Sequence, residues 1–208
     1  MRRVTPARPV SSWRNELEAV ACGPMFGFDG GHVRPLTALR DRAAGVELES
    51  TQPDVGGMVA VVNGAARWVD GGTVPDGATV AVQGYPAVVV NGSVAVTGAH
   101  DQEQVSRVAV GIDRDGRVFL AFARALSMLA FARWIAANGG ISAAYLDGGS
   151  AGAIDTRNGS VSVNATRALP SVVGFAATSS SSSTLERFDP APVILGLAAA
   201  FAWRRARR

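Results

Sequence analysis

The sequence predicts an α+β fold, in which a mixed, strand-rich sheet is flanked by a few helices within a single domain. Its 208 residues are enough for one domain that buries a hydrophobic core. Short apolar runs rich in valine alternate with glycine-containing turns, and glycine occurs 24 times. One longer segment, 128–138, carries the periodicity of an amphipathic helix.

The first half of the chain is expected to consist mainly of short strands and loops. Gly23–Gly31 contains several glycines and is expected to form a loop, whereas Leu36–Ala44 shows a weak helical pattern. The continuous apolar run Met58–Val62 ends at the strong turn signal Asn63-Gly64 and predicts a buried strand. Two further strands are predicted at 66–69 and 79–82.

Two hairpins are predicted in the central part of the chain. The first, 86–96, turns at Asn91-Gly92, and the second, 108–123, turns at Asp113–Gly116. The Asp-x-Asp-Gly pattern of the second turn also occurs in calcium-binding loops. Because the other ligands of such a loop are missing, a solvated turn is predicted there.

A helix and a buried strand are predicted next. Ser127 can cap a helix that runs from Met128 to about Asn138 and ends at Gly139-Gly140. The strand is expected at Ile141–Leu146. The apolar positions that share one face of the helix, and are therefore expected to pack on the core, are Met128, Phe131, Ala132 and Ile135.

The sequence divides into four segments. Residues 1–17 are a basic, proline-containing, irregular lead-in, and residues 18–177 are expected to form the folded domain. Residues 178–190 form a serine-rich linker. Residues 191–208 form a tail, in which an apolar run precedes a cluster of arginines.

Positive charge is concentrated at the two ends of the chain. All 20 basic residues are arginines, and eight of them lie outside 16–203. The 12 that remain are outnumbered by 17 acidic residues, so the body of the chain is acidic. A continuous basic face for a phosphate backbone is therefore not expected, and nucleic acid is not predicted as a partner.

The chain contains few side chains that bind metals or form disulfides. Cys22 is the only cysteine, which excludes an intrachain disulfide, and histidine occurs only at His32 and His100. No metal or other cofactor is predicted. A metal held by Asp147 together with carbonyl groups and water stays open, because no sequence spacing would reveal such a site.

The segment Tyr145–Gly152 carries the most distinctive pattern. An apolar run ends there in a single carboxylate, Asp147, which Gly148 and Gly149 follow directly. A carboxylate at the end of a buried strand is costly unless it is paired, and glycines let a ligand approach the backbone closely. The pattern indicates a strand end that presents an acid to a cleft, with an exposed tight turn as the alternative.

Four short motifs follow one another along the chain: Ala21–Phe26, Pro86–Gly92, Arg107–Gly116 and Leu146–Ser150. Their order resembles the phosphodiester glycosidase family, which includes the mannose-6-phosphate uncovering enzyme. The corresponding family patterns are N-A-G-M-F, P-x-L-V-x-x-G, R-x-A-V-G-I-x-x-x-G and L-D-G-G-x-S. The resemblance covers about residues 18–175. Cys22 replaces the early asparagine, and the glycine turn is one residue shorter before Ser150.

The resemblance implies hydrolysis of a sugar-1-phosphodiester in a glycan, which releases the sugar and leaves a phosphomonoester. A phosphate leaving group needs a cation, and the bidentate donors of an arginine make Arg107 the catalytic candidate. Asp147 is the catalytic carboxylate candidate, as nucleophile or base beside an oxocarbenium-like carbon. Backbone N–H groups of Gly148 and Gly149 and the Ser150 hydroxyl are the substrate-binding candidates.

Two further substrate-binding candidates precede Arg107 in a polar loop. His100 and Asp101 could also act as general acid or base, with a solvated loop as the alternative. The alternative for Arg107 is an ordinary surface arginine.

Two other kinds of function stay compatible with the sequence. A non-catalytic member that binds phosphosugars or glycans, or that is an envelope-associated structural module, would account for Cys22 and the shortened turn. A serine hydrolase would use Gly148–Gly152, which fits G-x-S-x-G. No histidine follows Ser150 and no helix is predicted after it, so the triad order of that fold cannot be completed.

The C-terminal tail predicts export to a bacterial cell envelope. The serine linker, the proline-flanked apolar run 193–203 and the terminal arginines resemble PEP-CTERM-like sorting tails, whose arginines stay in the cytoplasm. The run is shorter than the roughly 20 residues that span a bilayer. The tail is therefore a candidate for membrane association, with a frayed amphipathic end as the alternative. No N-terminal signal peptide is recognised.

Overall fold

The computed structural model describes residues 19–29, 32–43, 45–97, 103–156, 162–166, 169, 172–175, 183–187 and 193–197. Within these residues the predicted α+β class is confirmed. The strands form sheets of four, five and seven strands and a two-stranded ribbon, and every described pair of strands is antiparallel. One α-helix and one short 3₁₀ turn accompany them in the described part of the chain.

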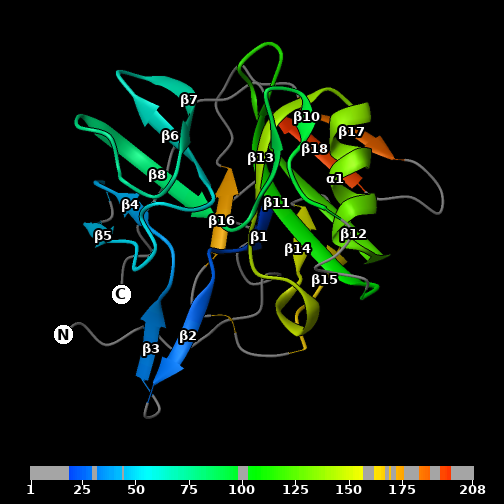
Figure 1. The fold of residues 1–208 in the computed structure, drawn as a ribbon, viewed down its shortest axis with the longest axis horizontal. Helices are drawn as coiled ribbons and strands as arrows, with labels where there is room; N and C mark the ends of the chain where they lie inside the picture. Colours follow the sequence, from blue (N-terminus) through cyan, green and yellow to red (C-terminus); the bar gives the residue numbers. More distant parts are fainter. Residues whose placement is uncertain are drawn as a thin grey trace.

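The seven-stranded sheet has parts of the hydrophobic core on both of its faces and is called the central sheet; Figure 1 shows it in the right half of the molecule. Its strand order is β10-β9-β13-β11-β12-β18-β17. In chain order the strands are β9 (Ala87–Val90), β10 (Ser93–Val94), β11 (Val105–Asp113), β12 (Val118–Leu126), β13 (Gly140–Tyr145), β17 (Ser183–Arg187) and β18 (Val193–Leu197). Both predicted central hairpins are therefore confirmed, and β11 lies between its hairpin partner β12 and strand β13, which follows helix α1 in the chain.

Helix α1 (Met128–Ala137) covers one face of this sheet (Figure 1). The Ser127 side chain accepts a hydrogen bond from the Ala130 backbone N–H at 3.2 Å, which confirms the predicted N-cap. All four positions of the predicted apolar stripe are buried, and they pack against side chains of β9, β11, β12 and β13. The helix thus closes one half of the hydrophobic core.

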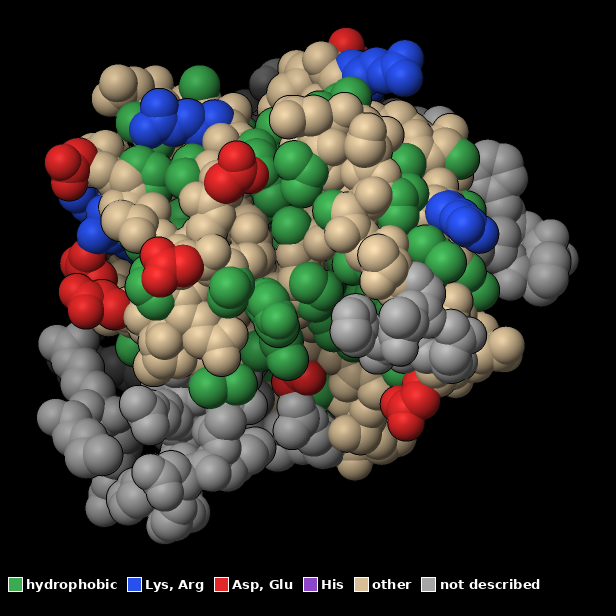
Figure 2. Space-filling view, viewed as in Figure 1, with side chains coloured by type: hydrophobic (Ala, Val, Ile, Leu, Met, Phe, Trp, Pro, Cys, Tyr) green, Lys and Arg blue, Asp and Glu red, His purple; other side chains and the backbone are tan. Residues whose placement is uncertain are grey.

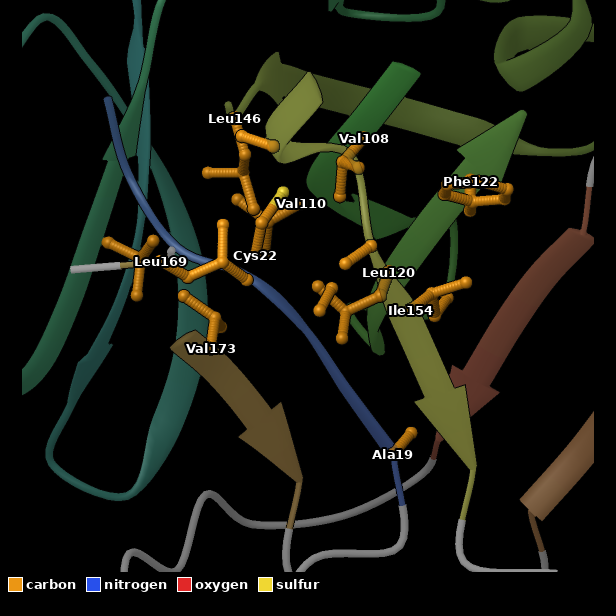
Figure 3. Close-up of a cluster of buried hydrophobic side chains, with 14 of the residues drawn as sticks. Ala19, Cys22, Val108, Val110, Leu120, Phe122, Leu146, Ile154, Leu169 and Val173 are labelled. Carbon is orange, nitrogen blue, oxygen red and sulfur yellow. The ribbon is translucent and has the colours of Figure 1, made fainter. Parts of the chain in front are cut away.

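A four-stranded sheet covers the opposite face, where the second half of the core lies (Figure 3). It is formed by β1 (Ala19–Cys22), β14 (Ile154–Thr156), β15 (Ser162–Val163) and β16 (Val172–Phe175). Cys22 from β1 is fully buried there together with Val110, Leu120 and Leu146. The segment around Cys22 is therefore fixed against the back of the central sheet.

The remaining strands form a five-stranded sheet and a hairpin. The sheet contains β4 (Leu39–Asp41), β5 (Val46–Leu48), β6 (Gly57–Val62), β7 (Ala65–Asp70) and β8 (Ala78–Gly84), and the hairpin contains β2 (Phe26–Asp29) and β3 (His32–Pro35). The strands predicted at 58–62, 66–69 and 79–82 are confirmed as the cores of β6, β7 and β8.

Two local predictions in this region are wrong. The predicted loop Gly23–Gly31 contains strand β2, which pairs with β3 over its whole length. The predicted helix Leu36–Ala44 contains strand β4, because β4 lies between β5 and β8 and forms ladders with both. Pairing with strands on both of its edges outweighs a weak local helical pattern in so short a segment.

Gln83 ties a loop to this sheet and is fully buried. Its Oε1 accepts a hydrogen bond from the Ala38 N–H at 2.7 Å, and its Nε2 donates to the carbonyl oxygens of Gln52 and Val55. Gln83→Leu would leave these three backbone groups without partners. We expect it to lower the free energy of unfolding by about 3 kcal/mol, measured by urea denaturation.

Gln52→Leu is the matched control, because the Gln52 side chain is exposed and only its backbone carbonyl contacts Gln83. It should change the free energy of unfolding by no more than about 0.5 kcal/mol. Equal effects of the two substitutions would show that the Gln83 amide does not hold the loop.

Figure 2 shows arginine and carboxylate side chains near one another along the left edge of this face and singly elsewhere, with hydrophobic side chains gathered near its middle. In the β11–β12 turn, Asp113 accepts hydrogen bonds from the backbone N–H groups of Asp115 and Arg117 and from the Arg117 guanidinium. This carboxylate is therefore used within its own turn.

The C-terminal segments contribute backbone to the central sheet. β18 pairs with β12, and β17 pairs with β18. Parts of the predicted linker and tail thus extend the sheet, while the lead-in 1–17 lies outside the described residues. Within the portion of the chain that is described, no helix combines the length and the apolar character needed to cross a membrane.

Candidate active site

Several segments that are distant in sequence meet where β13 ends. The Leu146 N–H donates to the Val108 carbonyl at 2.8 Å, so the chain stays beside β11 as it leaves the strand. The Asp147 N–H donates to the Gly23 carbonyl at 3.3 Å. The segment after β1 and the middle of β11 therefore flank residues 147–152, which we call the Asp147 turn.

Backbone and side-chain contacts fix Asp147 within this turn. The Cys22 Sγ–H donates to the Asp147 carbonyl oxygen at 2.8 Å, and the Gly148 N–H donates to Asp147 Oδ1 at 3.0 Å. The residue is half-buried. The arrangement orients a partly accessible carboxylate, and it commits the predicted substrate-binding N–H of Gly148 to that carboxylate.

The Asp147 turn packs closely on β11 and on the side chain of Tyr145. A Cβ atom placed on Gly148 would overlap with Tyr145 Oη and would lie 2.7 Å from the Ser106 carbonyl oxygen. A Cβ atom on Gly152 would lie 2.6 Å from the Cβ of Ser106. Both glycines are therefore required by close approach rather than by their backbone angles.

Arg107 lies beneath the same end of the sheet and is only 4% exposed. Its Nε donates to the Leu126 carbonyl at 3.0 Å and its Nη2 to the Glu103 carbonyl at 2.8 Å. The guanidinium also lies 5.6 Å from the centroid of the Tyr145 ring. Arg107 is thus a buried cation rather than a surface arginine.

Tyr145 connects Arg107 with the Asp147 turn and was missed as a site residue. Its side chain is 8% exposed, and Arg107 Nη1 donates to its hydroxyl at 3.5 Å. In the sequence it is one more residue of a buried run. The only signal was its polar hydroxyl, which needs a partner when it is buried.

Burial raises the pKa of Tyr145 above its usual 10.0, and the hydrogen bond and charge of Arg107 oppose that rise. The hydroxyl is therefore neutral at physiological pH. The contribution of Tyr145 to the free energy of unfolding is fully present below pH 10.0, because the phenol is then protonated in both the folded and the unfolded protein. It falls at higher pH, since the unfolded chain releases the proton first.

This shift can be measured because the chain has two tyrosines. In the Tyr85→Phe protein, phenolate absorbance in the near ultraviolet reports Tyr145 alone. We expect its midpoint above that of the same protein unfolded in urea. A midpoint at or below the unfolded value would contradict the buried position of the ring.

The other predicted site residues differ in what surrounds them. Gly149 has φ +56° and is the first residue of the 3₁₀ turn η2 (Gly149–Ala151), which lies between β13 and β14. Ser150, within this turn, is exposed. The Ser150 carbonyl accepts from the Thr166 N–H at 2.8 Å. His100 and Asp101 lie outside the described residues.

The geometry after Ser150 does not match the nucleophile elbow of a serine hydrolase. That elbow places the serine between a strand and a helix. Here the chain passes from η2 directly into strand β14. Among the described residues, no group of three or more His, Cys, Asp or Glu side chains could hold a metal ion. The absence of a metal requirement stays a prediction.

These features define an antiparallel α+β domain that presents one oriented carboxylate beyond a central strand, with a buried guanidinium close to the same turn. The family model for phosphodiester glycosidases matches residues 27–176. The chain therefore belongs to the phosphodiester glycosidase family.

A solved structure of another protein shows the same fold. The catalytic domain of zebrafish N-acetylglucosamine-1-phosphodiester alpha-N-acetylglucosaminidase, auto-inhibited by its pro-peptide, is 14% identical with a TM-score of 0.66. The match covers 84% of this chain and 68% of that chain. A hypothetical protein from Synechocystis is 13% identical with a TM-score of 0.49, covering 93% of this chain and 54% of that chain. A search of curated proteins found no match.

Proposed function

We propose that this chain hydrolyses sugar-1-phosphodiester linkages in glycans, releasing the sugar and leaving a phosphomonoester. Membership of the phosphodiester glycosidase family supports a hydrolase of this general type. The observation that carries the proposal is the orientation of Asp147 by the Gly148 N–H, on a turn that packs against the Arg107–Tyr145 pair.

Asp147 would act on the sugar carbon. As the bond to phosphate breaks, this carbon becomes positively charged, and a nearby carboxylate stabilises it or attacks it as a nucleophile. The Gly148 N–H donates to Asp147 Oδ1 and fixes the direction of this carboxylate before substrate binds.

Arg107 would stabilise the negative charge of the departing phosphate. Its charge is weakly screened because the side chain is buried, so it acts more strongly than an exposed arginine would. Gly149, which is half-buried, and Ser150, which is exposed, would bind oxygen atoms of the substrate. His100 and Asp101 stay proposed contributors from the loop that leads to Arg107.

The proposal is tested by incubating the full chain with a methyl phosphodiester of N-acetylglucosamine-1-phosphate, chosen because the zebrafish relative is named for this sugar linkage. We expect free sugar and methyl phosphate to appear in equal amounts. Absence of both products from this and other sugar-1-phosphodiesters would contradict the proposal.

A second function is favoured by one observation, the position of Cys22. The resemblance in sequence places Cys22 where the family motif has an asparagine, and its thiol donates to the Asp147 carbonyl oxygen. A domain changed at this position could bind sugar phosphates without cleaving them. Calorimetric titration that detects binding of the same diester, with no product after long incubation, would select this function.

We also propose that the glycan substrate lies in the cell envelope and that the C-terminal segment directs export and membrane association. The serine-rich linker, the terminal arginines and the part of the apolar run that follows β18 support this. Fractionation of bacteria that express the full chain, or a chain with the terminal arginines replaced by serine, tests it. Recovery of both in the cytosol would contradict it.

A further inference from the structure

The hydroxyl of Tyr145 occupies the space between Arg107 and the Asp147 turn. On one side, Arg107 Nη1 donates to it at 3.5 Å, and the guanidinium lies over the ring. On the other side, it lies so close to the Gly148 Cα that a Cβ atom there would overlap with it. One oxygen atom therefore touches both the buried cation and the turn.

The position of this oxygen is set by the sheet. The Tyr145 N–H donates to the Pro86 carbonyl at 2.9 Å, and its carbonyl accepts from the Tyr85 N–H at 2.8 Å. Tyr145 pairs with Ala109 on β11, and Arg107 lies two residues before Ala109 on the same face. The ring and guanidinium are thus diagonal neighbours on adjacent strands.

The contact with Gly148 bears on the reacting carboxylate. The Gly148 N–H is the donor to Asp147 Oδ1, so a shift of Gly148 turns that N–H away from the carboxylate. The hydroxyl supports the backbone from which this hydrogen bond is made. Because Arg107 is the donor in their hydrogen bond, the contact of the hydroxyl with Gly148 is one of close packing.

We propose that Tyr145 is a positioning residue for the hydrolysis, whose hydroxyl joins the Arg107 guanidinium to the Gly148 backbone and so holds the Asp147 carboxylate in its reactive orientation. This inference rests on the proposed function for its effect on turnover. The link between hydroxyl and turn is a separate claim, which is measurable without any substrate.

The first experiment compares Tyr145→Phe with the full chain. Phenylalanine keeps the ring over the guanidinium and removes only the hydroxyl oxygen. We expect kcat to fall by about 10- to 100-fold, because small displacements of reacting groups have effects of this size. KM should stay within about twofold, since the hydroxyl supports the carboxylate and not the bound substrate.

Tyr85→Phe is the matched control, because Tyr85 is 41% exposed and lies in the neighbouring segment. It should leave kcat and KM unchanged. Equal kcat values for Tyr145→Phe and the unmodified chain would overturn the proposal. So would a loss of kcat that is fully explained by unfolding at the assay temperature, as shown by circular dichroism.

The second experiment measures hydrogen exchange of the Gly148 amide in protein labelled with nitrogen-15 glycine. We expect Tyr145→Phe to speed exchange at Gly148 and to leave Gly92, in the β9–β10 turn, unchanged. Unaltered exchange at Gly148 would overturn the link. If the unmodified chain shows no hydrolysis, the proposed function fails, and this measurement alone decides whether the hydroxyl holds the turn.

Discussion

Asp147→Asn is expected to lower turnover of a sugar-1-phosphodiester by at least about 1,000-fold. Asparagine has nearly the same shape, and its Oδ1 can still accept the hydrogen bond from the Gly148 N–H. What it lacks is the negative charge that stabilises the developing positive charge on the sugar carbon. The melting temperature should therefore stay within a few degrees.

The measurement is the initial rate of sugar release by equal amounts of folded protein. Asp115→Asn is the control, because Asp115 lies exposed in the β11–β12 turn, where it pairs with Arg117. It should retain full activity. Unchanged turnover in Asp147→Asn would refute the assignment of this carboxylate.

Gly148→Ala is the second substitution with a large expected effect. The new methyl group would overlap with Tyr145 Oη and approach the Ser106 carbonyl, which is backbone and cannot move aside cheaply. We expect a loss of about 3 kcal/mol in the free energy of unfolding, together with nearly complete loss of turnover. Chemical denaturation and the sugar-release assay measure the two effects.

The double substitution Tyr145→Phe with Gly148→Ala identifies the cause. Removal of the hydroxyl takes away the nearest atom, so the double variant should be more stable than the sum of the two single effects predicts. Strictly additive effects would mean that the hydroxyl and Gly148 are not in contact.

Much of the fold could be predicted because it depends on local patterns. The run Met58–Val62 became β6, and the helix after Ser127 has the cap and the buried face that its periodicity indicates. Segment 39–41 could not be predicted in this way. Its three residues become a strand through pairing with β5, the next strand along the chain, and with β8, from which β5, β6 and β7 separate it in sequence.

The candidate site shows the same division between local and distant information. The acid and glycines of the Asp147 turn are contiguous, so their pattern is visible in the sequence. The contact between Arg107 and Tyr145 joins residues 38 positions apart, and that between Cys22 and Asp147 joins residues 125 apart. Both depend on which strands become neighbours, and side-chain periodicity does not encode that.

The most direct test of this account is the position of oxygen from solvent in the products. If Asp147 acts on the sugar carbon, hydrolysis breaks the bond between that carbon and the phosphate oxygen, and water enriched in oxygen-18 reports which bond was broken. Mass spectrometry should then find the label in the hydroxyl group on C1 of the released sugar and none in the phosphomonoester. Label in the phosphomonoester would show attack at phosphorus and would contradict a glycosidase mechanism for this site.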